Sequence, residues 1–143
     1  MAVRYFALIF GIIYLLVGIL GLIPGLVAPP PPVGVTVNVL SGFLLGLFPV
    51  NIVHTLVHLI VGLWGILAYR SFDASRTYAR TIGVVLIIFF VIGLIPGLNV
   101  LFGLVPLFGT DVWLHLVSGI IALYFGLTAR ATAEAVMPPP PAI

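Results

Sequence analysis

Residues 4–26 read RYFALIFGIIYLLVGILGLIPGL, which is one arginine, a long apolar run and a motif of glycines around a proline. About 20 mostly apolar residues are enough for a helix to cross the hydrocarbon core of a bilayer. Because lipid offers no partners for open backbone groups, such a run has to be helical there. Residues 76–98 repeat the pattern, from Arg76 to a second GLIPGL. The two stretches predict a membrane-spanning unit that occurs twice in the chain.

The overall composition also indicates a membrane protein. Of the 143 residues, 63% are hydrophobic and 6% are charged, whereas about a quarter of a soluble domain is charged. The net charge of +2 is too small for the dense basic face that nucleic-acid binding requires. The chain contains no cysteine, which excludes disulfides, thiolate catalysis and cysteine-ligated metal centres. We therefore expect one transmembrane domain over residues 1–143.

Four segments are apolar and long enough to be transmembrane helices, so the sequence predicts an all-α membrane protein with four spans. The predicted spans are Tyr5–Ile23, Asn51–Tyr69, Arg80–Ile95 and Asp111–Ala129.

The arginines predict the orientation of these helices. In a four-span arrangement all of them lie on one side of the membrane, namely Arg4, Arg70, Arg76, Arg80 and Arg130. They stand before the first span, in the connection between the second and third, and after the fourth. Since cytoplasmic loops carry the excess of basic residues, we expect both termini to be cytoplasmic. The membrane would be a bacterial inner membrane or a thylakoid membrane.

The two halves of the chain resemble each other, which predicts a duplicated helix hairpin covering about residues 4–70 and 76–130. GLIPGL recurs unchanged, and GLFP at residues 46–49 recurs as GLVP at residues 103–106. In both halves this proline is followed nine residues later by a His-Leu pair. Because each half contains two helices, both halves point the same way and form a parallel repeat.

The segments on the other side of the membrane are also apolar. Leu40–Val50 and Val100–Phe108 are too short to span a bilayer and too apolar to lie in water. We expect both to form short interfacial helices on the non-cytoplasmic side. The proline-rich tail, residues 131–143, is expected to be extended and poorly ordered.

A few polar residues interrupt the second and fourth spans. His54 and His58 are four residues apart, as are Asp111 and His115. Residues with this spacing share one face of a helix. Polar groups are costly in contact with lipid, so we expect the two faces to meet inside the bundle, near its non-cytoplasmic end.

Three interpretations of this polar cluster stay open. In the first, Asn51 and Asp111 are helix N-caps, and the histidines are hydrogen-bonded packing residues. In the second, His58 and His115 are axial ligands of a b-type haem or ligands of chlorophyll-type pigments, with His54 beside them. In the third, His54, His58, Asp111 and His115 hold a zinc or iron ion.

The rest of the sequence disfavours transport and catalysis. Both polar stripes stop about two helical turns into the membrane, and an ion route would need polar residues beyond them. The chain has no lysine and no cysteine, and no Ser-His-acid triad is visible. We therefore expect a non-enzymatic accessory protein, either a small subunit or an assembly partner of a larger membrane complex.

Several of these motifs resemble those of a known family. They are the run from GLFPVN through His54, His58-Leu59 and Gly62-Leu-Trp-Gly, and the run Asp111-Val-Trp-Leu-His115. The family they resemble is an uncharacterised one of bacterial four-helix integral membrane proteins, a domain of unknown function common in cyanobacteria and actinobacteria. The resemblance covers nearly the whole chain and implies a four-helix membrane fold without an established activity. Because the family occurs in phototrophs, it also implies, as a hypothesis, association with a photosynthetic membrane complex.

Overall fold

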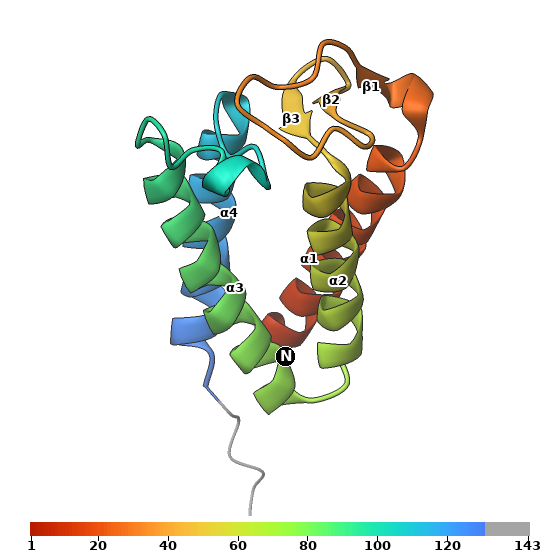
Figure 1. Cartoon of the computed structure of the whole chain (residues 1–143). Helices are drawn as coiled ribbons and strands as arrows, with labels where there is room; N and C mark the ends of the chain where they lie inside the picture. Colours follow the sequence, from red (N-terminus) through yellow and green to blue (C-terminus); the bar gives the residue numbers. More distant parts are fainter. Residues whose placement is uncertain (131–143) are drawn as a thin grey trace, which may run out of the picture.

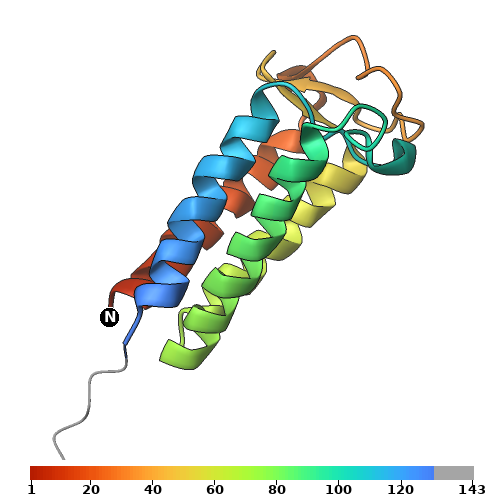
Figure 2. The same ribbon diagram turned by 90° about the vertical axis from the view of Figure 1, so that its left-hand side faces the viewer.

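The computed structural model describes residues 1–130, so the predicted proline-rich tail (residues 131–143) lies outside the described part of the chain. Four α-helices run alongside one another in that part (Figures 1 and 2). They are α1 (Ala2–Gly21), α2 (Ile52–Ala68), α3 (Phe72–Gly93) and α4 (Thr110–Thr128). The start of α1 and the end of α4 lie at one end of the bundle, and the two long loops lie at the other (Figure 1). The mostly helical fold is thus confirmed.

Three of the four helices, α1, α3 and α4, are long and apolar enough to cross a membrane. The remaining helix, α2, is apolar as well but has only 17 residues. Large apolar side chains project outward from the bundle, among them Ile60 of α2 and Leu127 of α4, which are 66% and 62% exposed. Such a continuous apolar exterior is not found on soluble monomers and suits a lipid environment.

Helix α3 begins earlier than the sequence predicts. The expected span starts at Arg80, with Arg76 and Arg80 in the preceding connection, whereas both residues belong to the first turns of α3. Ser71 caps this helix, because its hydroxyl accepts a hydrogen bond from the Ala74 amide at 3.1 Å. Hydropathy locates the apolar part of a helix. It does not locate the polar turns that lie between the N-cap of a helix and its apolar part.

The helices pack as two pairs, α1 with α2 and α3 with α4. Glycines allow the backbones within each pair to come close. A methyl group at Gly11 would lie 2.7 Å from the backbone nitrogen of Ile66 in α2, and one at Gly83 would lie 2.9 Å from that of Leu123 in α4. Small residues have this role in helix packing within lipid, where no hydrophobic effect drives the helices together.

The two pairs meet in an apolar core near the end that holds the start of α1. Tyr78 of α3 and Ala122 of α4 are completely buried there. Phe6 of α1 stacks on Phe125 of α4, with ring centroids 4.8 Å apart. This core leaves the opposite end of the bundle for the polar cluster.

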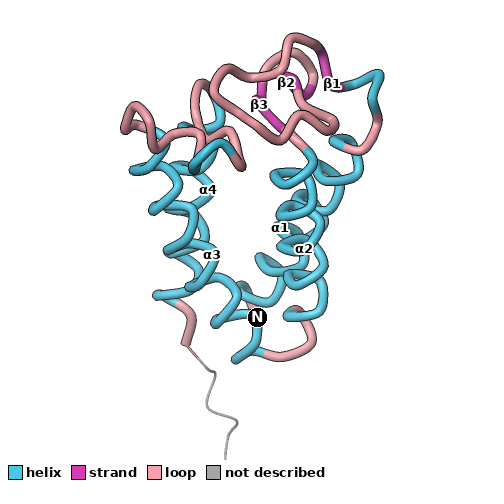
Figure 3. The backbone as a smooth tube through the Cα atoms, in the orientation of Figure 1, coloured by secondary structure: helices cyan, strands magenta, loops and turns pink. Residues whose placement is uncertain are grey.

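A small β-sheet covers that opposite end (Figure 3). Its three antiparallel strands, in the order β1-β2-β3, are β1 (Val27–Ala28), β2 (Gly42–Leu44) and β3 (Phe48–Val50). Val27 pairs with Leu44 across the first two strands. Gly42 fits because it has no side chain, since a methyl group there would lie 2.5 Å from the Ala28 carbonyl oxygen.

The sheet corrects our expectation that Leu40–Val50 forms an interfacial helix. Leu45 and Gly46 both have positive φ, 53° and 73°, and they reverse the chain between β2 and β3. Glycine adopts this backbone conformation at little cost. The backbone groups of the segment consequently pair across a hairpin instead of along a helix. A short apolar run does not by itself distinguish these two outcomes.

The corresponding loop of the second half, Val100–Phe108, also lacks the predicted interfacial helix. It contains one turn of 3-10 helix, Leu101–Gly103, in which Phe102 has a φ of 58° that an α-helix cannot continue through. The loop of the first half is tied to this turn, because the Thr36 hydroxyl donates a hydrogen bond to the Gly103 carbonyl at 3.0 Å. The two loops therefore form a joint cover over the end of the bundle.

Candidate functional site

The polar residues that the sequence predicts to meet do lie together, beneath the sheet, where α2 and α4 begin. Six of them are buried, each at most 9% exposed: Asn51, His54, Thr55, His58, Asp111 and His115. Since α2 and α4 belong to different helix pairs, the cluster lies between the two pairs.

Asn51 is the N-cap of α2, as predicted. Its side-chain oxygen accepts a hydrogen bond from the His54 amide at 3.0 Å. Its side-chain nitrogen donates to the carbonyls of Leu104 at 2.7 Å and Val37 at 3.2 Å. One side chain thus starts α2 and ties this start to both loops that cover the cluster.

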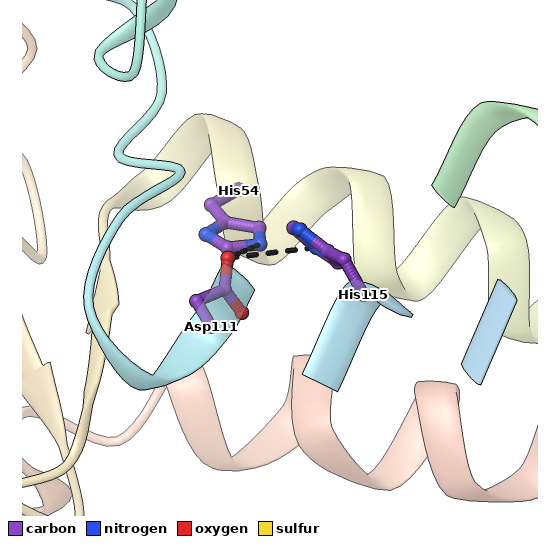
Figure 4. Close-up of side chains that lie close together, drawn as sticks. All are labelled: His54, Asp111 and His115. Atoms are coloured by element: carbon purple, nitrogen blue, oxygen red, sulfur yellow. Dashed lines mark ion pairs between the residues drawn. The ribbon is translucent and has the colours of Figure 1, made fainter. Parts of the chain in front are cut away.

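His54, Asp111 and His115 form a compact group in the cluster, with the Asp111 carboxylate facing both imidazoles (Figure 4). Asp111 Oδ2 lies 3.4 Å from His115 Nε2 and 3.9 Å from His54 Nε2. One ligand atom from each of the three residues lies within 4.8 Å of the other two. His54 comes from α2 and the other two residues from α4, so the group bridges the helix pairs.

Asp111 does not cap α4, which corrects the prediction. The N-cap is Gly109, whose φ of 70° turns the chain into the helix, and Thr110 is the first helical residue. Asp111 follows in the first turn, where a carboxylate is favoured by the positive end of the helix dipole. Its side chain points into the bundle instead of back to the backbone, and its buried Oδ2 has no hydrogen-bond partner.

Hydrogen bonds fix the proton position on His54 and His58. Nδ1 of His54 lies 3.3 Å from the Pro49 carbonyl, and Nδ1 of His58 lies 3.0 Å from the His54 carbonyl. A carbonyl only accepts, so Nδ1 carries the hydrogen in both rings and Nε2 is free to bind something else. This is the usual arrangement of a histidine that ligates a metal or a haem iron.

The His54 ring packs against both histidines of the predicted pair, His58 and His115. Its centroid lies 4.7 Å from that of His58 and 6.2 Å from that of His115. Both rings line a cavity of about 210 Å³, whereas pockets for ligands of drug size have roughly 300–1,000 Å³. His58 alone also lines a larger groove, of about 590 Å³, that runs between α1 and α4.

Two aromatic residues of the site are missing from the sequence-based prediction. Tyr14 of α1 stacks on the His58 ring at a centroid distance of 5.0 Å and an interplanar angle of 16°. Phe89 of α3 lies against the His115 ring at 5.7 Å. The signal for Tyr14 is its place four residues after Phe10 on one face of α1. Phe89 has no comparable signal, because it lies in a uniformly apolar run.

Comparison with known proteins identifies the family of the chain. No curated protein and no solved structure matches it. A family model described as a domain of unknown function, DUF4383, matches residues 4–128, which include α2, α3, α4, all but the first two residues of α1, and the whole polar cluster. The chain therefore belongs to the DUF4383 family, which confirms the expected membership in an uncharacterised family.

Proposed function

We propose that this protein is a non-enzymatic, four-span accessory protein that packs against a larger membrane complex. A fourth span is supported by α2, which lies along α1. At about 1.5 Å per residue, its 17 residues extend roughly 26 Å, close to the hydrocarbon thickness of about 30 Å. The flanking backbone at Tyr69 and Asn51 adds to this length.

The orientation that we propose places both termini in the cytoplasm. The arginines at that end of the bundle support it through the positive-inside rule. Two of these arginines also donate hydrogen bonds to carbonyls near helix C-termini. Arg4 donates to the Tyr69 carbonyl at 2.8 Å, at the end of α2, and Arg80 donates to the Gly126 carbonyl at 2.9 Å, near the end of α4. Guanidinium groups at helix C-termini are favourable in their own right.

The proposed duplication of a helix hairpin is supported by matching contacts in the two pairs. Gly11 meets Ile66 in the first pair, and Gly83 meets Leu123 at the corresponding positions of the second. Gly62 likewise meets Leu15, and its counterpart Gly119 meets Ile87. Two hairpins with the same close approach and the same motif order are what a parallel repeat would produce.

The observation that carries the accessory role is the apolar groove between α1 and α4. It has a volume of about 590 Å³, and its walls include Ile9 and Ile13 of α1 and Leu114 and Ile121 of α4. The groove lies on the outside of the bundle, where lipid or a partner would meet it. A transmembrane helix of a larger complex, including a photosynthetic one, would bury this surface.

A native gel tests the proposal. Membranes of the source organism that contain the tagged chain are solubilised in a mild detergent, and the purified chain in the same detergent marks the small species. We expect the wild type to migrate in a large complex. Ile13→Trp, which fills the groove, should release the chain, and Ile60→Trp, on the exposed face of α2, should not. A wild type that migrates as the small species would overturn the accessory role.

A second candidate function is binding of a haem or a chlorophyll-type pigment through His58, with His115 as the other ligand of the predicted pair. It is favoured by the free Nε2 of His58 and by the position of this ring on both the groove and the smaller cavity. The absorption spectrum of the protein in mild detergent tests it. A Soret band that His58→Ala removes would support the candidate, and a band that survives both His58→Ala and His115→Ala would refute it.

A further inference from the structure

We propose that His54, Asp111 and His115 bind one divalent transition-metal ion, of the Zn²⁺ or Fe²⁺ type, and that this ion links the two helix pairs. The inference does not depend on the accessory role proposed above. It rests on the spacing of the three groups, on their burial, and on the hydrogen bonds around them.

The spacing fits an ion between the three groups better than direct hydrogen bonds. Good hydrogen bonds between nitrogen and oxygen measure about 2.7–3.2 Å, whereas Asp111 Oδ2 lies 3.4 Å from His115 Nε2 and 3.9 Å from His54 Nε2. Ligand bonds of about 2.0–2.1 Å in a tetrahedral zinc site place neighbouring ligand atoms roughly 3.4 Å apart. The pair of Asp111 and His115 already has that separation, whereas His54, which lies within 4.8 Å of the other two ligand atoms, would have to move inward.

The burial of Asp111 gives the second argument. This residue is 2% exposed, and its Oδ2 has no hydrogen-bond partner in the described part of the chain. A buried carboxylate without a compensating partner is strongly unfavourable. A bound divalent cation would compensate it directly, since two neutral imidazoles and one carboxylate leave a net charge of −1 for the ion to balance.

The surroundings of His54 are those of a metal ligand. The Pro49 carbonyl holds the hydrogen of His54 on Nδ1, so that Nε2 is directed to the ligand position. A cavity of about 90 Å³ lies beside the group, and His54, His58 and Asp111 are the polar residues of its otherwise apolar lining. It has room for a water molecule as a fourth ligand.

The ligand types select the class of ion. Two imidazoles and a carboxylate suit zinc and ferrous iron. Soft monovalent copper prefers thiolate and thioether ligands, and the chain has no cysteine. Because His54 belongs to α2 and the other ligands belong to α4, the ion would also hold the two hairpins together at the end covered by the sheet.

Metal titration of the full-length protein in mild detergent tests the inference. The affinity tag must be free of histidine, and chelator removes any metal before the experiment. Zn²⁺ is the first probe, measured by elemental analysis, and Co²⁺ is the second, because its visible absorption reports tetrahedral nitrogen and oxygen ligands. We expect one ion per chain and a higher unfolding temperature with Zn²⁺ than with chelator.

Three variants and one control assign the ligands. His54→Ala, His115→Ala and Asp111→Asn should each weaken metal binding at least about tenfold. Asp73→Asn makes the same change at an exposed carboxylate in the first turn of α3, outside the group, and should leave binding unchanged. Asp111→Asn keeps the size of the side chain, and gel filtration and circular dichroism show whether each variant is folded.

Two results would overturn the inference. The first is a folded wild type that takes up no stoichiometric Zn²⁺ or Co²⁺ and gains no thermal stability from either ion. The second is binding that responds to Asp73→Asn as strongly as to Asp111→Asn, or that survives all three ligand variants, because the ion would then be held elsewhere.

Discussion

Asn51 satisfies three backbone groups with a single buried side chain. It accepts from the His54 amide, which starts α2, and it donates to the carbonyls of Val37 and Leu104 in the two covering loops. Each of these groups would otherwise lose a partner away from water, and such losses are more costly than the hydrogen bonds themselves are favourable. Asn51 therefore holds the two covering loops in place above the polar cluster.

We predict that Asn51→Ala lowers the free energy of unfolding by about 2–4 kcal/mol, from the lost cap and two unsatisfied carbonyls. Ser71→Ala removes the exposed cap of α3 and is the matched control, with an expected loss of about 1 kcal/mol. Reversible unfolding in mixed detergent micelles measures both. Equal losses in the two variants would show that the contacts of Asn51 with the loops do not stabilise the fold.

The residue types of the site could be predicted from the sequence, but their exact partners could not. Spacing of four residues correctly placed the two polar faces inside the bundle, because polar groups avoid lipid. It could not show that Gly109 rather than Asp111 caps α4, since that depends on a positive φ. Nor could it show that the His58 ring stacks on Tyr14.

The helices and the covering sheet differ in how well the sequence predicts them. Long apolar runs leave helix as the one solution in lipid, so all four helices were expected, although α3 begins well before its predicted span. The strands β2 and β3 have three residues each, and nothing in an apolar run of that length separates a hairpin from a helical turn. Their pairing depends on Leu45 and Gly46, whose backbone angles the apolar pattern does not encode.

The glycine contacts between paired helices predict that a larger residue at these positions lowers stability. A methyl group at Gly62 would lie 2.8 Å from the Gly11 carbonyl oxygen, and it would also collide with the backbone of Leu15. Gly62→Ala should therefore force α1 and α2 apart and cost about 1–3 kcal/mol of stability.

Gly25 provides the control, because no atom lies within 4 Å of the position that a methyl group would take there. Gly25→Ala should leave the unfolding midpoint in detergent nearly unchanged. If Gly62→Ala were as harmless as Gly25→Ala, the close packing of α1 on α2 would not be present in the membrane.

The whole molecule consists of two helix pairs that enclose a polar cluster at one end and an apolar core at the other. The motif repeat predicted two equivalent hairpins, and the matching glycine contacts support this interpretation. The sequence predicted that the polar faces of α2 and α4 meet, but it could not predict how the hairpins pack in the apolar core, because the faces that meet there are all apolar. Packing between apolar faces is decided by shape, which composition does not encode.

Four membrane crossings underlie the proposed orientation, the proposed exposure of the groove to lipid and the proposed depth of the polar cluster in the membrane. The chain has no cysteine, so single cysteines can be labelled with a membrane-impermeant maleimide in intact cells. Val33 and Phe102 are 89% and 81% exposed in the two loops, and Asp73 is exposed at the start of α3.

Four crossings with cytoplasmic termini predict that Val33→Cys and Phe102→Cys are both labelled from outside the cell. Asp73→Cys should be labelled only after the membrane is permeabilised. If α2 did not span, the chain would cross three times, and Val33 and Asp73 would lie on the same side. Labelling of Val33→Cys and Phe102→Cys from opposite sides of the membrane would therefore show that the chain does not cross four times.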